Sequence, residues 1–147
     1  MKDIEITINN IKRKEIFILL HEIDTLFFPS LSTRIDLGKY ADKISEYADT
    51  IGIRKNGKVI GMFSFYSNDT VNKKAFITLL GVIPEFAGMG YGTILLEECI
   101  KFVKEKNFQT IELKVNTKNK KAISLYEKFG FIPVDKDGLF LLMRKTV

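Results

Sequence analysis

One short segment, Gly88-Met89-Gly90-Tyr91-Gly92, places three alternating glycines between an apolar run and a helical pattern. Glycine has no Cβ, so the backbone can turn sharply there and bring several N–H groups close to a ligand. The first N–H groups of a helix lack intrahelical acceptors, and the helix dipole favours negative charge at that end. The segment therefore predicts a phosphate-binding turn between a strand and a helix.

The residues that follow these glycines distinguish between other types of phosphate-binding loop. A Walker loop ends in Gly-Lys-Ser/Thr, whereas Gly92 is followed by Thr93 and Ile94, which excludes that loop. A dinucleotide-binding fingerprint would open the first βαβ unit and would carry a glycine where Thr93 stands, so it is only a distant alternative. A glycine-rich turn that binds no ligand is the third alternative.

The apolar pattern predicts antiparallel strands in the first half of the chain and a βαβ-type segment in the second. The dipeptides Asn56-Gly57 and Asp137-Gly138 favour tight hairpins, and Gly81 inside an apolar run indicates a bulge or a close backbone approach. We expect strands at 4–8, 51–54, 59–66, 75–83, 110–115, 131–134 and 139–143, and helices at 12–22, 39–48, 91–106 and 120–129.

Length and composition predict one domain over residues 1–147, because 46% hydrophobic positions suffice for one core. The apolar runs are too short to cross a membrane and the first residues lack a secretion signal, so we expect a cytoplasmic protein without a membrane partner. Cys99 and His21 are each the only residue of their type, and both are interpreted as structural. No metal site is expected.

Positive charge gathers late in the chain. The net charge is +5, and the stretch from Lys101 to Lys128 holds eight lysines against three glutamates. A phosphate-rich cofactor, a nucleic acid, an acidic membrane or a plain solvated face would each account for this charge. Few aromatic residues stand among these lysines, which argues against nucleic acid.

A second sequence motif reduces the number of protein families that could account for the glycine segment. The pattern L-x-V-x-x-x-N-x-x-A-x-x-L-Y-x-x-x-G-F is met by Leu113, Val115, Asn119, Ala122, Leu125, Tyr126, Gly130 and Phe131. Together with the glycine segment, it makes the chain resemble the GCN5-related N-acetyltransferase (GNAT) superfamily over residues 59–143; the first fifty residues resemble it by element order alone. The resemblance implies an α/β (α+β) fold: a mixed, mainly antiparallel sheet of about six or seven strands with about four helices, splayed around the cofactor site.

The resemblance implies transfer of an acyl group from acetyl-coenzyme A, or another acyl-coenzyme A, to a primary amine by direct attack in a ternary complex. Tyr126 would be the general acid for the departing thiolate, and the backbone N–H of Leu80 or Val82 would polarise the thioester carbonyl. The cofactor would contact Leu80, Gly81, Val82, Ala87, Gly88, Met89, Gly90, Tyr91, Gly92, Thr93, Asn116, Asn119 and Tyr126.

Two residues depart from the family pattern. Ala87 replaces a glutamine or arginine, which assigns the pyrophosphate to backbone amides. Thr78 stands where many members place a glutamate that deprotonates the amine, so the general base is unassigned. An acceptor amine of low pKa, such as that of an amino sugar, would need a base least. Candidate bases are Asp36, Asp69, Glu112 and His21, with Thr78 or Tyr66 holding a water.

The acceptor is expected beside the loop that follows the first helix, at Phe28, Ser32, Arg34 and Thr78. Arg34 would bind a carboxylate or phosphate, or would form a surface pair with Asp36. The main hypothesis is an N-acyltransferase for a small molecule such as an amino sugar, sugar nucleotide or amino acid. The alternatives are a protein N-terminal or lysine acetyltransferase and a non-catalytic module that binds coenzyme A or nucleic acid. Monomer and homodimer both stay open.

Overall fold

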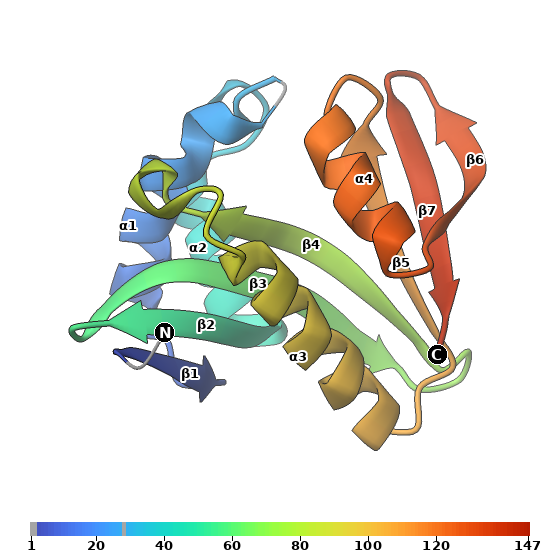
Figure 1. Ribbon diagram of the computed structural model, residues 1–147, viewed down its shortest axis with the longest axis horizontal. Helices are drawn as coiled ribbons and strands as arrows, with labels where there is room; N and C mark the ends of the chain where they lie inside the picture. The colour runs from blue at the N-terminus through green and yellow to red at the C-terminus, as the bar shows by residue number, and fades with distance from the viewer. Residues whose placement is uncertain (1–2, 28) are drawn as a thin grey trace.

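The computed structural model describes residues 3–27 and 29–147 (Figure 1). These residues form seven strands, four α-helices and three short 3-10 turns. In chain order they are β1 (Ile4–Ile8), α1 (Arg13–Ile23), η1 (Asp24–Leu26), η2 (Leu31–Thr33), α2 (Leu37–Tyr47), β2 (Asp49–Lys55), β3 (Lys58–Asp69), β4 (Lys74–Val82), η3 (Pro84–Phe86), α3 (Tyr91–Glu105), β5 (Thr110–Asn116), α4 (Lys120–Lys128), β6 (Ile132–Asp137) and β7 (Phe140–Thr146).

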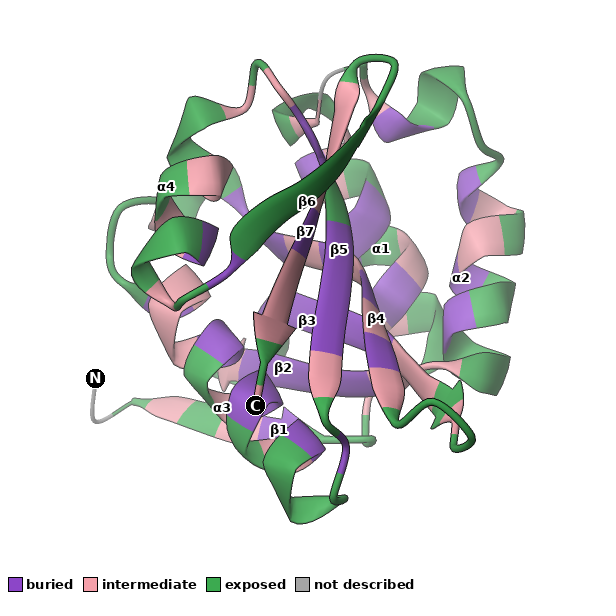
Figure 2. Ribbon diagram, turned by 90° about the vertical axis from the view of Figure 1, so that its right-hand side faces the viewer, coloured by how far each residue is buried: buried purple, intermediate pink, exposed green. Residues whose placement is uncertain are grey.

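The strands form one mainly antiparallel sheet in the order β1-β2-β3-β4-β5-β7-β6. Helices α1 and α2 cover one face, and α3 and α4 lie on the other (Figures 1 and 2). The middle of β5 is buried between these layers, and the largest enclosed side chains include Phe63, Phe65 and Phe131 (Figure 2). The fold class expected from the resemblance is confirmed.

The sheet splits between its two parallel strands. β4 and β5 are in register only from Lys74↔Thr110 to Ile77↔Leu113. Beyond those residues the strands diverge, so that β4 runs toward α1 while β5 runs toward α4 (Figure 1). The second halves of both strands therefore present edges without a β partner to the space between them.

A bulge in β4 lies at the start of this split. Ser64 is opposite Leu79 and Phe65 is opposite Ile77, which leaves Thr78 as an extra residue. The sequence predicts a bulge or a close backbone approach at Gly81, and the structure has a close approach of α1 to this residue. A Cβ at that position would lie 2.4 Å from Cδ1 of Ile23, so the absence of a side chain lets the end of α1 pack directly on β4.

The predicted elements are present, with shifts of a few residues at their ends. The Asn56-Gly57 hairpin is confirmed, with φ angles of 51° and 81°. The last hairpin turns one residue later than expected, at Gly138 and Leu139. Helix α2 begins two residues early because the Asp36 carboxylate accepts the Lys39 N–H at 2.9 Å.

In the described part of the chain, no helix is long and apolar enough to cross a membrane.

The lone cysteine and histidine occupy different surroundings. Cys99 is 0% exposed on the inner face of α3, and burial raises the pKa of its thiol, which is the environment of a core residue. His21 lies exposed near the end of α1, where its ring contacts Phe17 with centroids 4.6 Å apart.

Candidate active site

The glycine segment forms an open turn at the N-terminus of α3. Gly88 and Gly90 have φ angles of 77° and 83°, and no atom lies within 4 Å of the position that a Cβ would take at either residue. The first helical bond runs from the Ile94 N–H to the Gly90 carbonyl at 3.2 Å, so the amides of residues 91–93 have no intrahelical acceptor. The turn thus has the open space and the donors that a pyrophosphate needs.

Helix α4 lies beside this turn. A Cβ at Gly92 would be 3.8 Å from Cδ2 of Leu125, so the first turn of α3 contacts the helix that carries the second motif. Asn119 caps α4, because its Oδ1 accepts the Ala122 N–H at 3.2 Å. This bond fixes the side chain at the cleft, where a ligand would meet its Nδ2 group.

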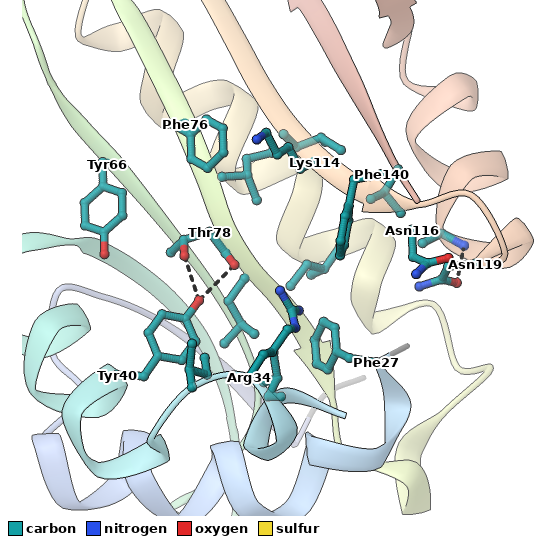
Figure 3. A pocket seen from close by; sticks show the side chains of 18 of the residues that line it. Phe27, Arg34, Tyr40, Tyr66, Phe76, Thr78, Lys114, Asn116, Asn119 and Phe140 are labelled. Carbon is teal, nitrogen blue, oxygen red and sulfur yellow. Dashed lines mark hydrogen bonds between the residues drawn. The ribbon is translucent and has the colours of Figure 1, made fainter. Parts of the chain in front are cut away.

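Asn116 precedes that cap at the end of β5. Its Oδ1 accepts the Lys118 N–H at 2.9 Å, and its carbonyl accepts the Asn119 N–H at 2.9 Å. Both asparagines line the cavity between the diverging strands (Figure 3). The turn from β5 to α4 is therefore held rigid where it faces the cleft.

The edge of β4 that faces the cleft carries backbone donors. The Ile83 N–H donates to the Ile60 carbonyl of β3 at 2.9 Å. Because backbone groups alternate in direction along a strand, those of Gly81 also face β3, whereas those of Leu80 and Val82 face the cleft. Either residue can therefore offer an N–H to a ligand, while Gly81 cannot offer its own.

Tyr126 lies on α4, where it is 7% exposed and lines the same cavity as Leu80. Its ring packs edge-on against Phe131 with centroids 5.6 Å apart. Burial raises the pKa of this phenol, and the neighbouring Cys99 thiol adds a smaller effect in the same direction. The hydroxyl therefore keeps its proton, as a general acid must before it acts.

A cavity of about 880 Å³ occupies the split in the sheet (Figure 3). Aromatic side chains form much of its wall, and four cations face only two carboxylates around it. The aromatic residues are Phe27, Tyr40, Tyr66, Phe76, Tyr126 and Phe140; the cations are Arg34, Lys39, Lys43 and Lys114; the carboxylates are Asp36 and Asp137.

Two hydroxyl groups are hydrogen-bonded to each other where the family pattern would place a glutamate. The Tyr40 Oη lies 2.9 Å from the Thr78 carbonyl oxygen and 2.6 Å from Thr78 Oγ1. A carbonyl can only accept, so Tyr40 donates to it and Thr78 Oγ1 donates to Tyr40. Burial raises the pKa of Tyr40 to about 12. The Tyr66 hydroxyl is also buried in the cavity wall and has no partner among the described residues.

Of the candidate bases, only Asp36 lines the cavity, and its carboxylate also caps α2. His21 lies outside the cavity. Asp69 is engaged with Asn72 in the turn that follows β3.

Glu112 is also outside the cavity. It is buried on β5, where its carboxylate lies 2.6 Å from Arg144 and 3.3 Å from Lys74. The two cations neutralise the charge of this buried carboxylate, which gives it a structural role.

The predicted acceptor residues have different surroundings. Arg34 and Thr78 line the cavity, whereas Ser32 is exposed and binds the Asp24 carboxylate through its hydroxyl at 2.6 Å and its N–H at 2.8 Å. The possible Arg34–Asp36 pair is not formed; the guanidinium carbon lies 5.5 Å from the centre of the Phe140 ring instead. Phe28 lies outside the described residues.

Several lining residues were not predicted as site residues: Tyr40, Lys43, Phe76, Lys114 and Phe140. Tyr40 follows the helical spacing of α2 and carries no motif. The other four residues lie on separate strands and helices, and they line one cavity only because the sheet splits between β4 and β5.

A comparison with known protein families gives a match that is consistent with the amide-lined turn and the splayed strands. The acetyltransferase (GNAT) family matches residues 17–131. The chain belongs to this family, and it is therefore an acyltransferase.

Among relatives of this GNAT chain, the probable N-acetyltransferase san of Drosophila melanogaster is 30% identical over 140 residues, which cover 89% of this chain and 67% of the fly protein. The ribosomal protein bS18-alanine N-acetyltransferase of Haemophilus influenzae is 38% identical over 81 residues, covering 55% of this chain and 53% of that enzyme. The match thus spans about half of the length of the bacterial relative.

The structure of the PaiA N-acetyltransferase of Thermoplasma acidophilum in complex with coenzyme A superposes with a TM-score of 0.76. The sequences are 19% identical, and the superposition covers 97% of this chain and 99% of that one. At this identity the likeness concerns the fold, which is the same in the two proteins.

Proposed function

We propose that this GNAT chain, acting as one domain over residues 1–147, transfers an acyl group from an acyl-coenzyme A to the primary amine of a small molecule. The observation that carries the proposal is the arrangement along the cleft edge of β4. The amide-lined turn follows this strand, while Leu80 and the buried Tyr126 share one cavity with the aromatic and basic side chains. Coenzyme A bound to the Thermoplasma acidophilum protein of the same fold supports this donor.

The turn fits the phosphate end of coenzyme A. Its unpaired amides and the positive end of the helix dipole would hold the pyrophosphate without a glutamine or arginine at Ala87. The pantetheine arm would run along β4, where the backbone groups of Leu80 and Val82 face the cleft. Coenzyme A would supply the acyl group as a thioester.

In the proposed reaction the neutral amine attacks the thioester carbonyl carbon, a C–N bond forms, and the carbonyl oxygen gains negative charge. The N–H of Leu80 or Val82 would stabilise this charge, an effect of about 10²–10³ in rate for one such donor. Collapse of the intermediate breaks the C–S bond. Tyr126 would then give its proton to the departing thiolate and would recover one from solvent.

The amine must lose protons during the reaction, and no carboxylate stands at position 78 to take one. Thr78 Oγ1 donates to Tyr40, so its lone pairs are left to accept from a water or from the amine itself. We propose that a water bound at the Tyr40–Thr78 hydroxyl pair carries the proton away. An acceptor amine of low pKa would make the step easiest.

A second acceptor class, a protein N-terminus, is suggested by the bacterial relative, whose name gives an alanine of ribosomal protein bS18 as its substrate. The α-amine of a peptide also has a pKa lower than that of lysine. It would therefore suit a site without a carboxylate base.

The test is release of free thiol from acetyl-coenzyme A with a panel of amino sugars, amino acids, lysine-like amines and peptides with free N-termini. Mass spectrometry of the acylated product identifies the acceptor. We expect release that depends on the amine and is fastest with a small molecule. Fastest release with the peptides would favour the second acceptor class, and tight coenzyme A binding without turnover on any amine would favour a non-catalytic module.

A further inference from the structure

The cavity wall carries positive charge that the protein itself does not neutralise. Lys114 is paired with Asp137 at 3.3 Å, and the Asp36 carboxylate caps α2. Within residues 3–27 and 29–147, Arg34, Lys39 and Lys43 make no ion pair. Such a wall attracts an anion and disfavours a cationic ligand.

Arg34 is held in position for such an anion. Its N–H donates to the Leu31 carbonyl at 3.1 Å, and the bonds from Ser32 to Asp24 fix the short turn that precedes it. The guanidinium lies against the Phe140 ring and is directed into the cavity (Figure 3). A cation–π contact uses no hydrogen bond, so the N–H groups of the guanidinium are still available for a carboxylate or phosphate.

The same wall holds a buried hydroxyl group without a hydrogen-bond partner among the described residues. This hydroxyl belongs to Tyr66, and Lys43 Nζ lies 5.6 Å from the centre of the Tyr66 ring. Buried hydroxyls are almost always hydrogen-bonded in folded proteins. A polar group of the bound acceptor would satisfy this one.

We propose that the acceptor is an anionic primary amine whose carboxylate or phosphate group binds Arg34, with its amine directed to Thr78. This inference rests on the proposed function and adds the chemical class of the acceptor. Arg34 is then a specificity-determining residue. It contributes to acceptor affinity and takes no part in proton transfer.

Matched pairs of amines test the inference, because the members of a pair differ only in the anion. Glucosamine 6-phosphate and glucosamine form one pair, and 4-aminobutyrate and 4-aminobutanamide form the other. Thiol release from acetyl-coenzyme A gives kcat and KM for each member. We expect kcat/KM to be about tenfold or more higher for the anionic member of at least one pair, the size of one charge-assisted hydrogen bond.

Arg34→Gln should raise the KM of the anionic member about tenfold and leave the neutral member unchanged. Arg34→Lys should restore part of the preference, since it keeps the charge and loses the bidentate geometry. Lys14→Gln is the control, because it removes one positive charge from an exposed position of α1, away from the cavity.

Equal or better turnover of the neutral members would overturn the inference and leave the proposed function intact. A preference that Arg34→Gln does not change, or that Lys14→Gln reduces equally, would also overturn the assignment to Arg34. If no amine of either pair or of the wider panel releases thiol, the proposed function fails and the inference fails with it.

Discussion

The hydroxyl of Tyr40 bridges the two oxygens of Thr78, at 2.6 Å from Oγ1 and 2.9 Å from the carbonyl. The bridge joins α2 to β4 at the bulge where the sheet begins to split. The resemblance implies a glutamate at this position in many family members, and here a hydrogen-bonded pair of hydroxyls stands in its place. The chain must therefore handle the proton of its acceptor amine without a charged base at that point.

Removing the hydroxyl at position 78 should affect the reaction more than the fold. Thr78→Val keeps the shape of the side chain, and Tyr40 keeps its bond to the carbonyl, so we expect a loss of about 1 kcal/mol in unfolding free energy. We expect kcat to fall about tenfold or more, because the proposed water loses its acceptor. Thr146→Val, exposed on β7, is the control; equal kcat in the two variants would show that Thr78 has no role in proton transfer.

The pH dependence of kcat/KM should be set by the pKa of the acceptor amine. Burial raises the pKa of Tyr40 to about 12 and also raises the pKa values of Tyr66 and Tyr126, so all three phenols stay neutral below the ordinary tyrosine value of about 10. We expect kcat/KM to rise with pH up to the pKa of the amine. The midpoint should therefore shift between acceptors of different pKa. A midpoint that is the same for every amine would point to a titrating base on the protein.

Tyr126→Phe tests the general acid. The ring and its packing against Phe131 are kept, so we expect little change in stability or in coenzyme A affinity. We expect kcat to fall about 10²–10⁴-fold, the usual contribution of a positioned acid. Tyr47→Phe, at a tyrosine that is 63% exposed on α2, controls for loss of a phenol. Burst kinetics or calorimetry with acetyl-coenzyme A separates binding from chemistry, and an unchanged kcat would remove Tyr126 from the mechanism.

Gly81→Ala tests the contact between α1 and β4. The added Cβ would lie 2.4 Å from Ile23 Cδ1, and we expect a loss of about 1–3 kcal/mol in unfolding free energy, as for other overpacked cores. Ile23→Val removes that atom at a cost of about 0.5–1.5 kcal/mol by itself, and the two substitutions together should cost less than their sum. Gly92→Ala, whose Cβ would meet only Leu125 Cδ2 at 3.8 Å, serves as the stability control. Additive costs at positions 23 and 81 would contradict the contact.

The parts of the fold that depend on local chemistry could be predicted from the sequence. Asn56-Gly57 fixes its hairpin because both residues adopt positive φ, and the alternating glycines mark the turn before α3 for the same reason. The resemblance added the mixed, mainly antiparallel sheet and its four helices. These features depend on a few residues close together in the chain.

The acceptor side could not be predicted in this way, because it is assembled from distant segments. Tyr40, Tyr66 and Phe140 come from α2, β3 and β7, and they meet only where β4 and β5 diverge. Ser32 was expected to contact the acceptor, yet it binds Asp24 and supports the turn before Arg34. Nothing in the local sequence distinguishes a serine that contacts a ligand from one that holds a loop.

The assignment of the pyrophosphate to the turn at Gly88–Gly92 is measured most directly by titrating coenzyme A into wild type, Gly90→Val and Gly57→Val and following the heat of binding. Gly57 is the matched control, because its φ of 81° is close to the 83° of Gly90 and a valine strains both backbones alike. We predict that coenzyme A binds wild type and Gly57→Val with similar affinity and that Gly90→Val lowers the affinity at least about tenfold, through loss of the amide donors. Unchanged affinity in Gly90→Val would contradict the assignment of this turn to the pyrophosphate.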